Sequence, residues 1–289
     1  MSWALNFISE KNFETHVKET ILKYGKQLQS YTLQELNKNI VDPVKLIFDK
    51  SVYRLTWDEI IKSEIFRQRD KSNNNSIGYF HQNFFKYLNG CEVPEKGWDV
   101  IYKTEKGIEI SEGEKVHTIY VEMKNKHNTM NSASSAKTYI KMQNQLLLDD
   151  DCACFIIDAI AKNSQNIKWS TTVDGKQVGH RRIRRVSMDK FYEIITGEKN
   201  AFFEICKVLP KTVQHIIETS DEILREEDTA YTELAALSKL IGTDDKNLSF
   251  ALAIYMLGFN TYNGFDSLKP SRIKDSDNLS EYAEKLLMK

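Results

Sequence analysis

The sequence is poor in cysteine and has no long apolar run. Its 289 residues include four cysteines, and the Cys152-x-Cys154 pair supplies only half of a zinc site, so neither a disulfide framework nor a structural zinc ion is expected. The longest apolar run, residues 248–259, is 12 residues long and too short to cross a bilayer. The N-terminal residues lack the basic start and the uninterrupted apolar stretch of a secretory signal. These absences predict a cytoplasmic protein without a membrane segment.

The sequence also lacks an excess of charge of one sign. It has 40 Lys and Arg against 41 Asp and Glu, so its net charge of -1 indicates neither a nucleic-acid-binding nor a membrane-binding protein. The charge is nevertheless uneven. Residues 161–186 contain seven basic residues and one acid, whereas residues 218–289 contain 14 acids and eight basic residues. The basic stretch is equally consistent with phosphate contacts and with a strand edge that positive charge protects against aggregation.

The spacing of apolar residues divides the chain into three regions. Helical spacing predicts a helical N-terminal region over residues 1–72 and a helical C-terminal region over residues 216–289. Between them, residues 73–215 alternate β-branched, aromatic and polar residues, which predicts strands with one helix among them. The predicted strands are 98–102, 108–110, 116–124 and 153–160, and the predicted helix is 136–147. The predicted fold class is α/β of the α+β type, a mixed central sheet flanked by helices, and we expect one compact unit.

Two segments contain turn signals. The polar run Arg69–Ser76 predicts a solvated loop, followed by a helix that Ser76 caps and that ends before Asn89-Gly90. The dipeptide Asp174-Gly175 lies between two further strands, 167–173 and 180–186, and is a strong signal for a β-hairpin.

The most informative segments are residues 97–100 (GWDV) and 121–124 (VEMK). Successive side chains of a strand alternate between its faces, so Glu122 and Lys124 point to the same face, and a neighbouring strand can place Asp99 beside them. Two carboxylates at this distance suit Mg²⁺, and a lysine there can polarise a water molecule or stabilise negative charge on a phosphoryl oxygen. Taken alone, Glu-x-Lys is typical of any half-exposed strand.

The order of these segments resembles that of the PD-(D/E)XK nucleases: an Asp after a Gly turn, a hairpin-like segment, and an apolar strand ending in Glu-x-Lys. The runs VEMKNKHNTMNS (121–132), GYFHQ (78–82) and RIRRVSMDKFYEIITG (182–197) resemble a family of bacterial type II restriction endonucleases within that superfamily. Trp98 stands where the superfamily has a proline. The motifs span about half of the chain.

The resemblance implies a restriction-endonuclease-like core and a Mg²⁺-dependent enzyme that cuts both strands of a short palindrome, for example a GGNCC-like site, and leaves 5′-phosphate ends. It implies that Asp99 and Glu122 bind the metal together with the main-chain carbonyl of Met123. It implies that Lys124 orients the attacking water or stabilises charge. It also implies a homodimer on double-stranded DNA and a companion DNA methyltransferase that protects the host's sites.

Other polar residues near the motifs have open roles. His81 and Gln82 fit an addition to the metal site and fit an ordinary polar helix face equally well. The residues that we expect to contact DNA are Lys126, His127, Asn128, Asn131, Lys137, Lys141, Arg181, Arg182 and Arg184. Lys137 and Lys141 are equally consistent with the wet side of an amphipathic helix.

Two alternative functions fit the same residues. Structure-specific repair nucleases and junction resolvases use the same two acids and lysine but cut by DNA shape. A non-catalytic DNA-binding protein is the alternative of another class. The intact set of two acids and a lysine argues against it, because like charges that are buried together are costly to retain without a metal.

Overall fold

The computed structural model describes residues 3–220, 226–260, 262 and 265 of this chain. The chain divides into two compact units. Unit 1 comprises residues 1–24 and 74–221, and unit 2 comprises residues 25–73 and 222–289. The three regions predicted from the sequence follow the order of the chain, whereas each unit combines two segments that are distant in sequence.

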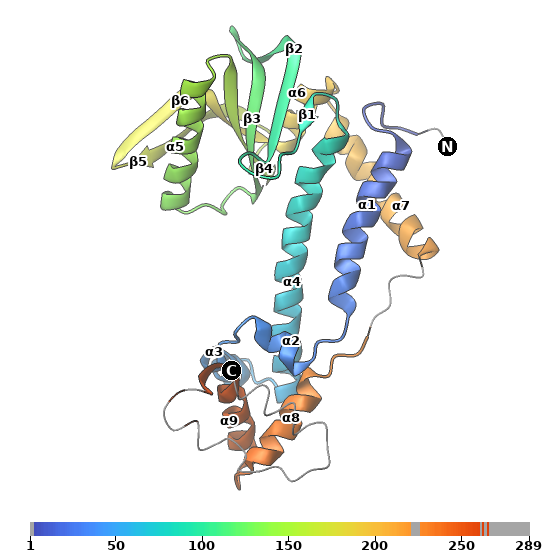
Figure 1. Cartoon of the computed structure of the whole chain (residues 1–289), viewed down its shortest axis with the longest axis vertical. Coiled ribbons are helices and arrows are strands. Elements are labelled where there is room, and N and C mark those ends of the chain that lie inside the picture. The colour runs from blue at the N-terminus through green and yellow to red at the C-terminus, as the bar shows by residue number, and fades with distance from the viewer. Residues whose placement is uncertain (1–2, 221–225, 261, 263–264, 266–289) are drawn as a thin grey trace. The chain divides into compact units, whose positions relative to one another are not determined.

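A mixed sheet of six strands forms the centre of unit 1 among the described residues (Figure 1). The order across the sheet is β1-β2-β3-β4-β6-β5. β3 and β4 are parallel to each other, as are β4 and β6, while the other neighbours are antiparallel. The strands are Cys91–Glu92 (β1), Val100–Ser111 (β2), Glu114–Lys126 (β3), Cys152–Ile160 (β4), Asn166–Val173 (β5) and Lys176–Ser187 (β6). This arrangement confirms the predicted α+β fold class.

Strand alternation separates two apolar layers on the faces of the sheet. In β4, Phe155 and Ile157 belong to one buried cluster, and Cys154 and Ile156 belong to another. The second cluster is covered by α5 (Ser132–Leu148), whose Tyr139 is fully buried against it. Figure 1 shows α5 beside β5 and β6, and the helix packs against β4, β5 and β6. A functional site on this face therefore has α5 as its neighbour.

The other face of the sheet packs against several helices. Their buried residues join those of β2, β3 and β4 in one cluster, which includes Phe13, Phe84, Phe85 and Phe191. These helices are α1 (Glu10–Gly25), the end of α4 (Trp57–Phe84), the short η2 (Phe85–Tyr87), α6 (Met188–Thr196) and α7 (Ala201–Thr219). This larger apolar layer is the main core of unit 1.

The hairpin of β5 and β6 has the two-residue turn predicted from its sequence. Val173 pairs with Lys176, and the turn residues Asp174 and Gly175 have φ angles of 49° and 73°. Positive φ at both positions is the conformation that Asp-Gly adopts most readily in tight hairpins. The prediction of this hairpin is confirmed.

The predicted loop at residues 69–76 is wrong, because α4 continues through it without a break. Asn and Ser favour loops since their side chains compete for main-chain hydrogen bonds. Tertiary contacts outweigh that preference here. Within unit 1, the Asn125 amide donates to the Asn74 carbonyl at 3.1 Å. Within unit 2, Arg69 forms an ion pair with Asp228 at 2.7 Å.

Unit 2 is a helical unit with its own apolar core. Its helices are η1 (Lys26–Leu28), α2 (Leu33–Lys38), α3 (Pro43–Val52), the first part of α4, α8 (Ala230–Ile241) and α9 (Lys246–Phe259). Thr32 and Asp42 cap α2 and α3 by accepting hydrogen bonds from Glu35 and Lys45. Leu36, Ile61 and Leu234 lie in the core with no more than 1% exposure. Within the described part of the chain, none of the helices has the length and apolar character needed to span a membrane.

Candidate active site

The two acids predicted to bind metal face each other across β2 and β3. In this antiparallel ladder Val100 pairs with Val121, and the Asp99 N–H donates to the Val121 carbonyl at 3.0 Å. Asp99 therefore lies opposite Glu122. Because Val100 and Val121 belong to the main core, alternation turns Asp99 and Glu122 to the face that α5 covers.

Asp99 extends the hydrogen-bond ladder with its side chain. Its Oδ2 accepts a hydrogen bond from the Met123 N–H at 2.7 Å, so the carboxylate has a fixed position at the end of the strand pair. Burial raises the pKa of Asp99, and the charge of Glu122 raises it further, although the Met123 N–H opposes both effects. Burial is the main cause of this raised pKa, and repulsion by the Glu122 charge contributes to it.

Glu122 lies between two lysines. Its Oε1 accepts from Lys124 at 2.9 Å and its Oε2 accepts from Lys141 at 2.7 Å. Burial alone would raise the pKa of Glu122, but the hydrogen bonds from Lys141 and Lys124 outweigh it and hold this pKa below its ordinary value. Glu122 is therefore ionised at neutral pH, as a metal ligand must be.

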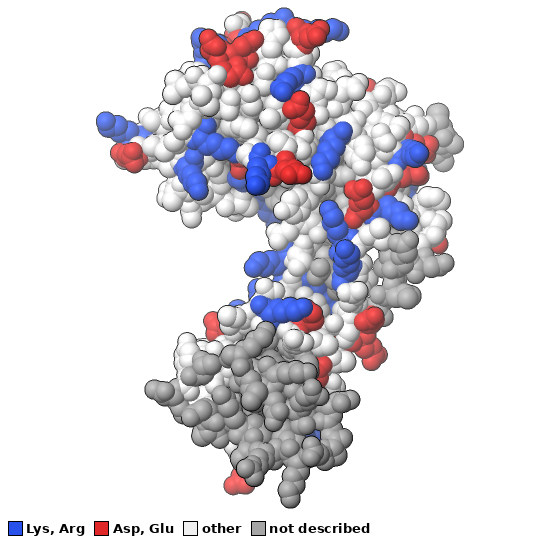
Figure 2. All heavy atoms as spheres, in the orientation of Figure 1, with Lys and Arg blue, Asp and Glu red and all other residues white. Residues whose placement is uncertain are grey.

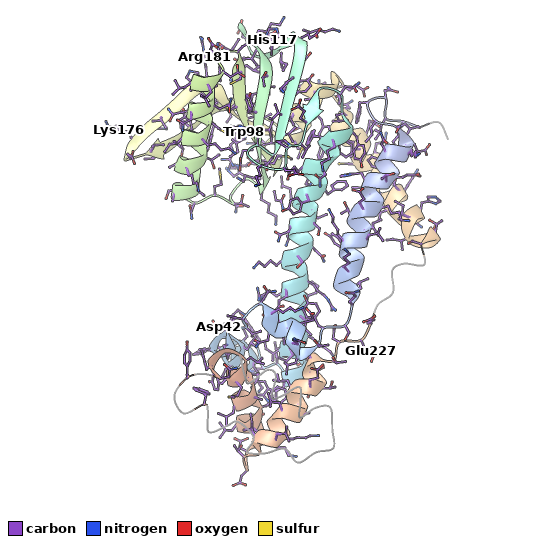
Figure 3. The ribbon with its side chains drawn as sticks, viewed as in Figure 1. Asp42, Trp98, His117, Lys176, Arg181 and Glu227 are labelled. Carbon is purple, nitrogen blue, oxygen red and sulfur yellow. The ribbon has the colours of Figure 1, made fainter. Side chains whose placement is uncertain are left out.

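Lys141 was expected among DNA-contacting residues, and the structure brings it to the acids instead. Its Nζ also donates to the Gly97 carbonyl at 2.5 Å and lies 4.1 Å from the centre of the Trp98 ring. Figure 3 labels Trp98 at the sheet, in the region between α5 and β3. Helical spacing puts Lys141 and Gln145 on one face of α5, but local spacing does not reveal that this face meets Glu122.

The donor set at the site fits Mg²⁺. Among the described residues, no group of three or more His, Cys, Asp and Glu side chains could hold a metal ion. Mg²⁺ does not need such a group, because it binds through one or two carboxylates and completes its shell with water and substrate phosphate. Asp99 and Glu122 supply two hard oxygen ligands, and the repulsion between them is a property that a divalent cation would relieve.

The accessory candidates on α4 differ in their relation to the acids. The Gln82 side-chain amide donates to the main-chain carbonyl of Asp99 at 3.2 Å, which fixes the backbone at that acid. His81 is half-buried beside the Phe80 ring. Burial, with a smaller contribution from the nearby His16, lowers the pKa of His81 to about 4.

The loop after β3 is tied to the sheet by a buried ion pair. Arg185 of β6 donates to both carboxylate oxygens of Asp158, at 2.6 and 3.0 Å, and also to the His127 carbonyl. Asn131 uses its side chain to cap α5, accepting from the Ser134 N–H at 2.8 Å. Lys126, Asn128 and Lys137 are exposed. Because these three side chains are exposed, they are able to contact DNA.

The arginines of β6 make intramolecular contacts. Arg182 donates to Glu114, and Arg184 is 8% exposed and donates to Asn166 at 2.5 and 2.7 Å. Arg181 is 69% exposed and pairs with Glu114 at 2.9 Å. Basic and acidic side chains are interspersed on the face of unit 1 drawn in Figure 2. DNA contact by Arg181, Arg182 and Arg184 stays a prediction, and these contacts favour it most for Arg181.

Comparison with known proteins identifies the family. The sequence model of the Eco47II restriction endonuclease family matches residues 5–218, which is most of the chain. The chain belongs to this family. The matched region contains Asp99, Glu122, both lysines and all of β1–β6.

Two relatives agree with the assignment to the Eco47II family. The type II restriction enzyme Sau96I of Staphylococcus aureus is 26% identical over 223 residues, which cover 74% of this chain and 82% of that protein. The type II restriction enzyme Eco47II of Escherichia coli is 25% identical over 224 residues, which cover 74% of this chain and 88% of that protein.

As a member of the Eco47II family, this chain is a type II restriction endonuclease, a site-specific deoxyribonuclease that binds double-stranded DNA. The prediction of this enzyme class is confirmed. The family match gives no support to a structure-specific repair nuclease or to a non-catalytic DNA-binding protein.

Proposed function

We propose that this type II restriction endonuclease hydrolyses DNA with Mg²⁺ at Asp99, Glu122 and Lys124. The observation that supports the proposal is the position of Asp99, directly before β2, opposite Glu122 on β3, with Lys124 bonded to Glu122 at 2.9 Å. Asp99 and Glu122 would hold the metal, together with the main-chain carbonyl of Met123. When bound, Mg²⁺ supplies Lewis acidity that lowers the pKa of water and offsets phosphoryl charge.

The proposed reaction is the hydrolysis of a phosphodiester bond by water, and the residues of the site have separate roles in it. The oxygen of a water molecule attacks the phosphorus and gives up a proton to solvent, the bond between phosphorus and the 3′ oxygen breaks, and this oxygen takes up a proton from solvent. The products are a 3′ hydroxyl and a 5′ phosphate. Lys124 orients the attacking water or stabilises the negative charge that builds on the phosphoryl oxygens. The Met123 N–H keeps the Asp99 carboxylate pointed into the site.

The proposed target is a short palindrome, and a GGNCC-like sequence follows from the resemblance of the motifs. One site of this kind cuts one strand, whereas a palindrome presents two symmetric scissile phosphates. A two-fold homodimer supplies both active sites with one interface. Light scattering of the DNA complex should therefore give two chains per duplex, and a mass of one chain per duplex would contradict the dimer.

Base and phosphate contacts are proposed for the exposed polar groups around the site. Lys126, Asn128 and Lys137 surround the end of β3 and the start of α5. His127 lies in the same loop, with its Nδ1 3.6 Å from Asp158. A companion DNA methyltransferase would protect the same sequence in the host. The four cysteines form no disulfide, which fits the proposed cytoplasmic location.

Removing Glu122 tests the proposed site. Glu122→Ala should lower the cleavage rate by about a thousandfold, the scale of losing a group that stabilises transition-state charge. Binding to the cognate duplex should persist, because base-reading side chains lie elsewhere. The matched control is Glu112→Ala, an exposed acid where β2 turns into β3. It should cut DNA like the wild type. Cleavage assays with Mg²⁺ would reject the site if Glu122→Ala also cut at the wild-type rate.

A further inference from the structure

Glu122 accepts hydrogen bonds from two lysines, whereas the proposed reaction gives a role to only one of them, Lys124. Each of its two carboxylate oxygens accepts from a different ammonium group, Oε1 from Lys124 and Oε2 from Lys141. Lys124 is near Glu122 because the two lie two residues apart on one strand face. Lys141 comes from α5 and reaches Glu122 only through the packing of that helix on the sheet. Its presence at the carboxylate needs a separate explanation.

Several groups hold the Lys141 side chain in its position. Besides bonding Glu122, its Nζ donates to the Gly97 carbonyl at 2.5 Å and lies 4.1 Å from the centre of the Trp98 ring. The Trp98 indole N–H donates to Gln145 at 3.2 Å, one helical turn beyond Lys141 on α5. An isolated surface ion pair would leave both side chains free to move. Here a carbonyl and an aromatic face hold the ammonium beside the carboxylate.

We propose that Lys141 is an internal counterion that competes with the divalent metal ion for Glu122. The proposal rests on the proposed function, in which Glu122 is a metal ligand. An ammonium group and a divalent cation on the same carboxylate repel each other strongly at a distance of a few ångströms. The metal therefore displaces Lys141 from Oε2. The Gly97 carbonyl and the Trp98 ring then retain the ammonium at the site.

This exchange changes the charge of the site. Without metal, the two acids Asp99 and Glu122 are balanced by Lys124 and Lys141. After the exchange, the same four side chains and a divalent cation carry two positive charges in excess. A site that becomes positive only when metal is bound attracts a DNA phosphate only when it is able to cut. Lys141 then contacts DNA as the sequence predicted, but after release from Glu122.

Metal titration of the DNA-free protein tests the competition. Isothermal titration calorimetry with Mg²⁺ compares the wild type, Lys141→Met and Lys137→Met. Lys141→Met should bind Mg²⁺ at least about fivefold more tightly, the lower end of typical coupling between sites. Lys137→Met removes the same charge from an exposed position one turn before Lys141 on α5, so it should bind like the wild type. Lys141→Arg keeps the positive charge and should restore the weaker binding.

Tryptophan fluorescence gives a second measurement that does not depend on cleavage. Mg²⁺ should change the fluorescence of the wild type, because the cation over the Trp98 ring moves. Trp98→Phe should remove the change and assign it to this ring. Lys141→Met should remove it as well. A Mg²⁺-induced change that is the same in Lys141→Met and the wild type would overturn the proposal.

The same titrations separate this inference from the proposed function. If Glu122→Ala bound Mg²⁺ as the wild type does, Glu122 would not be a metal ligand, and both proposals would fail. If Glu122→Ala lost Mg²⁺ binding while Lys141→Met bound Mg²⁺ no more tightly than Lys137→Met, only the counterion would fail. Weaker binding by Lys141→Met than by the wild type would likewise overturn the counterion, because it would show that Lys141 supports the site.

Discussion

Among single residues, Asp158 is a buried acid whose nearest cationic partner is Arg185. Its side chain is 0% exposed, and Arg185 is its bidentate partner, at 2.6 and 3.0 Å. Arg185→Met should lower the free energy of unfolding by about 3–5 kcal/mol, because it leaves a buried carboxylate without its counter-charge. Urea denaturation measures this loss. The double variant Asp158→Asn/Arg185→Met should lose less free energy of unfolding than Arg185→Met, because it has no buried carboxylate charge to leave unpaired.

A surface pair provides the control for this prediction. Lys103 and Glu92 form an ion pair at 3.2 Å, with both side chains more than half exposed. Lys103→Met should change the free energy of unfolding by less than about 1 kcal/mol, because water screens exposed pairs. Equal effects of Arg185→Met and Lys103→Met would show that the Asp158 site is more hydrated than its burial indicates.

His16 links the stability of unit 1 to pH. It is 2% exposed, its Nε2 bonds the Phe80 carbonyl at 2.9 Å, and its Nδ1 has no hydrogen-bond partner among the described atoms. Burial, together with the charges of Lys23 and Lys86, lowers the pKa of His16 from 6.5 to about 4, although the hydrogen bond with the Phe80 carbonyl opposes the shift. Between pH 6.5 and 4 the unfolded chain binds more protons than the folded chain. Stability is therefore complete above pH 6.5 and falls as the pH is lowered towards 4.

The contribution of His16 to this loss is measurable. It should reach roughly 3 kcal/mol at pH 4, because each unit of pKa shift corresponds to about 1.4 kcal/mol. Urea denaturation from pH 7 to pH 4.5 should show a shallower loss for His16→Phe than for the wild type. The exposed His215 is the control, and His215→Phe should follow the wild type. Parallel curves for His16→Phe and the wild type would contradict the buried, neutral histidine.

The residues of the site differ in how far their sequence predicts them. The proximity of Glu122 and Lys124 follows from strand alternation, and Asp99 follows from a short strand beside them. Lys141 is adjacent to Glu122 because α5 packs its Tyr139 and Met142 onto β4 and β6. That contact depends on how a helix docks on a sheet, which no local spacing contains. Local spacing therefore groups Asp99, Glu122 and Lys124, but it does not reveal that Lys141 lies beside them.

At the scale of elements, the hairpin of β5 and β6 contains an exposed arginine, Arg181, and a buried arginine, Arg184. Arg181→Ala should weaken binding to cognate and random duplexes alike and reduce the salt slope by about 1, because one exposed charge near the DNA is lost. Arg184→Ala should instead lower folding stability, because Asn166 loses its partner. Binding titrations at several salt concentrations, together with urea denaturation, check both variants. If the salt slopes of DNA binding were identical for Arg181→Ala and the wild type, the hairpin would be a solvated strand edge and not a DNA contact.

Local signals predict some elements and miss others for a physical reason. The Asp174-Gly175 turn depends on two residues whose positive φ angles match the twist of the flanking strands, so four residues suffice to predict it. The helix α4 depends on partners far along the chain. Asn125 lies 51 residues from Asn74, and Asp228 lies 159 residues from Arg69. Local propensity favours a loop at residues 69–76, and these distant contacts reverse it.

At the scale of the whole molecule, helical spacing predicts helices that are present among the described residues of both terminal regions, residues 266–289 lying outside the described part, but it does not reveal which helices share a core. Unit 2 joins α2, α3 and part of α4 to α8 and α9. Ser30 and Tyr31 accordingly bond Glu227 and Asp228, nearly 200 residues later. The family match ends at residue 218, before α8. The matched residues 5–218 therefore supply only part of the apolar core of unit 2, to which α8 and α9 also contribute.

One pair of substitutions on α8 tests whether the two units fold separately. Leu237 is 4% exposed in the core of unit 2, and Leu240 on the same helix is 46% exposed. Leu237→Asp should cost at least about 3 kcal/mol, because it loses apolar burial and buries a charge, whereas Leu240→Asp should cost little. Hydrogen exchange should show faster exchange in α2, α3, α8 and α9 of Leu237→Asp and unchanged protection in β3 and β4. Loss of protection in the strands as well would mean that the two units unfold together.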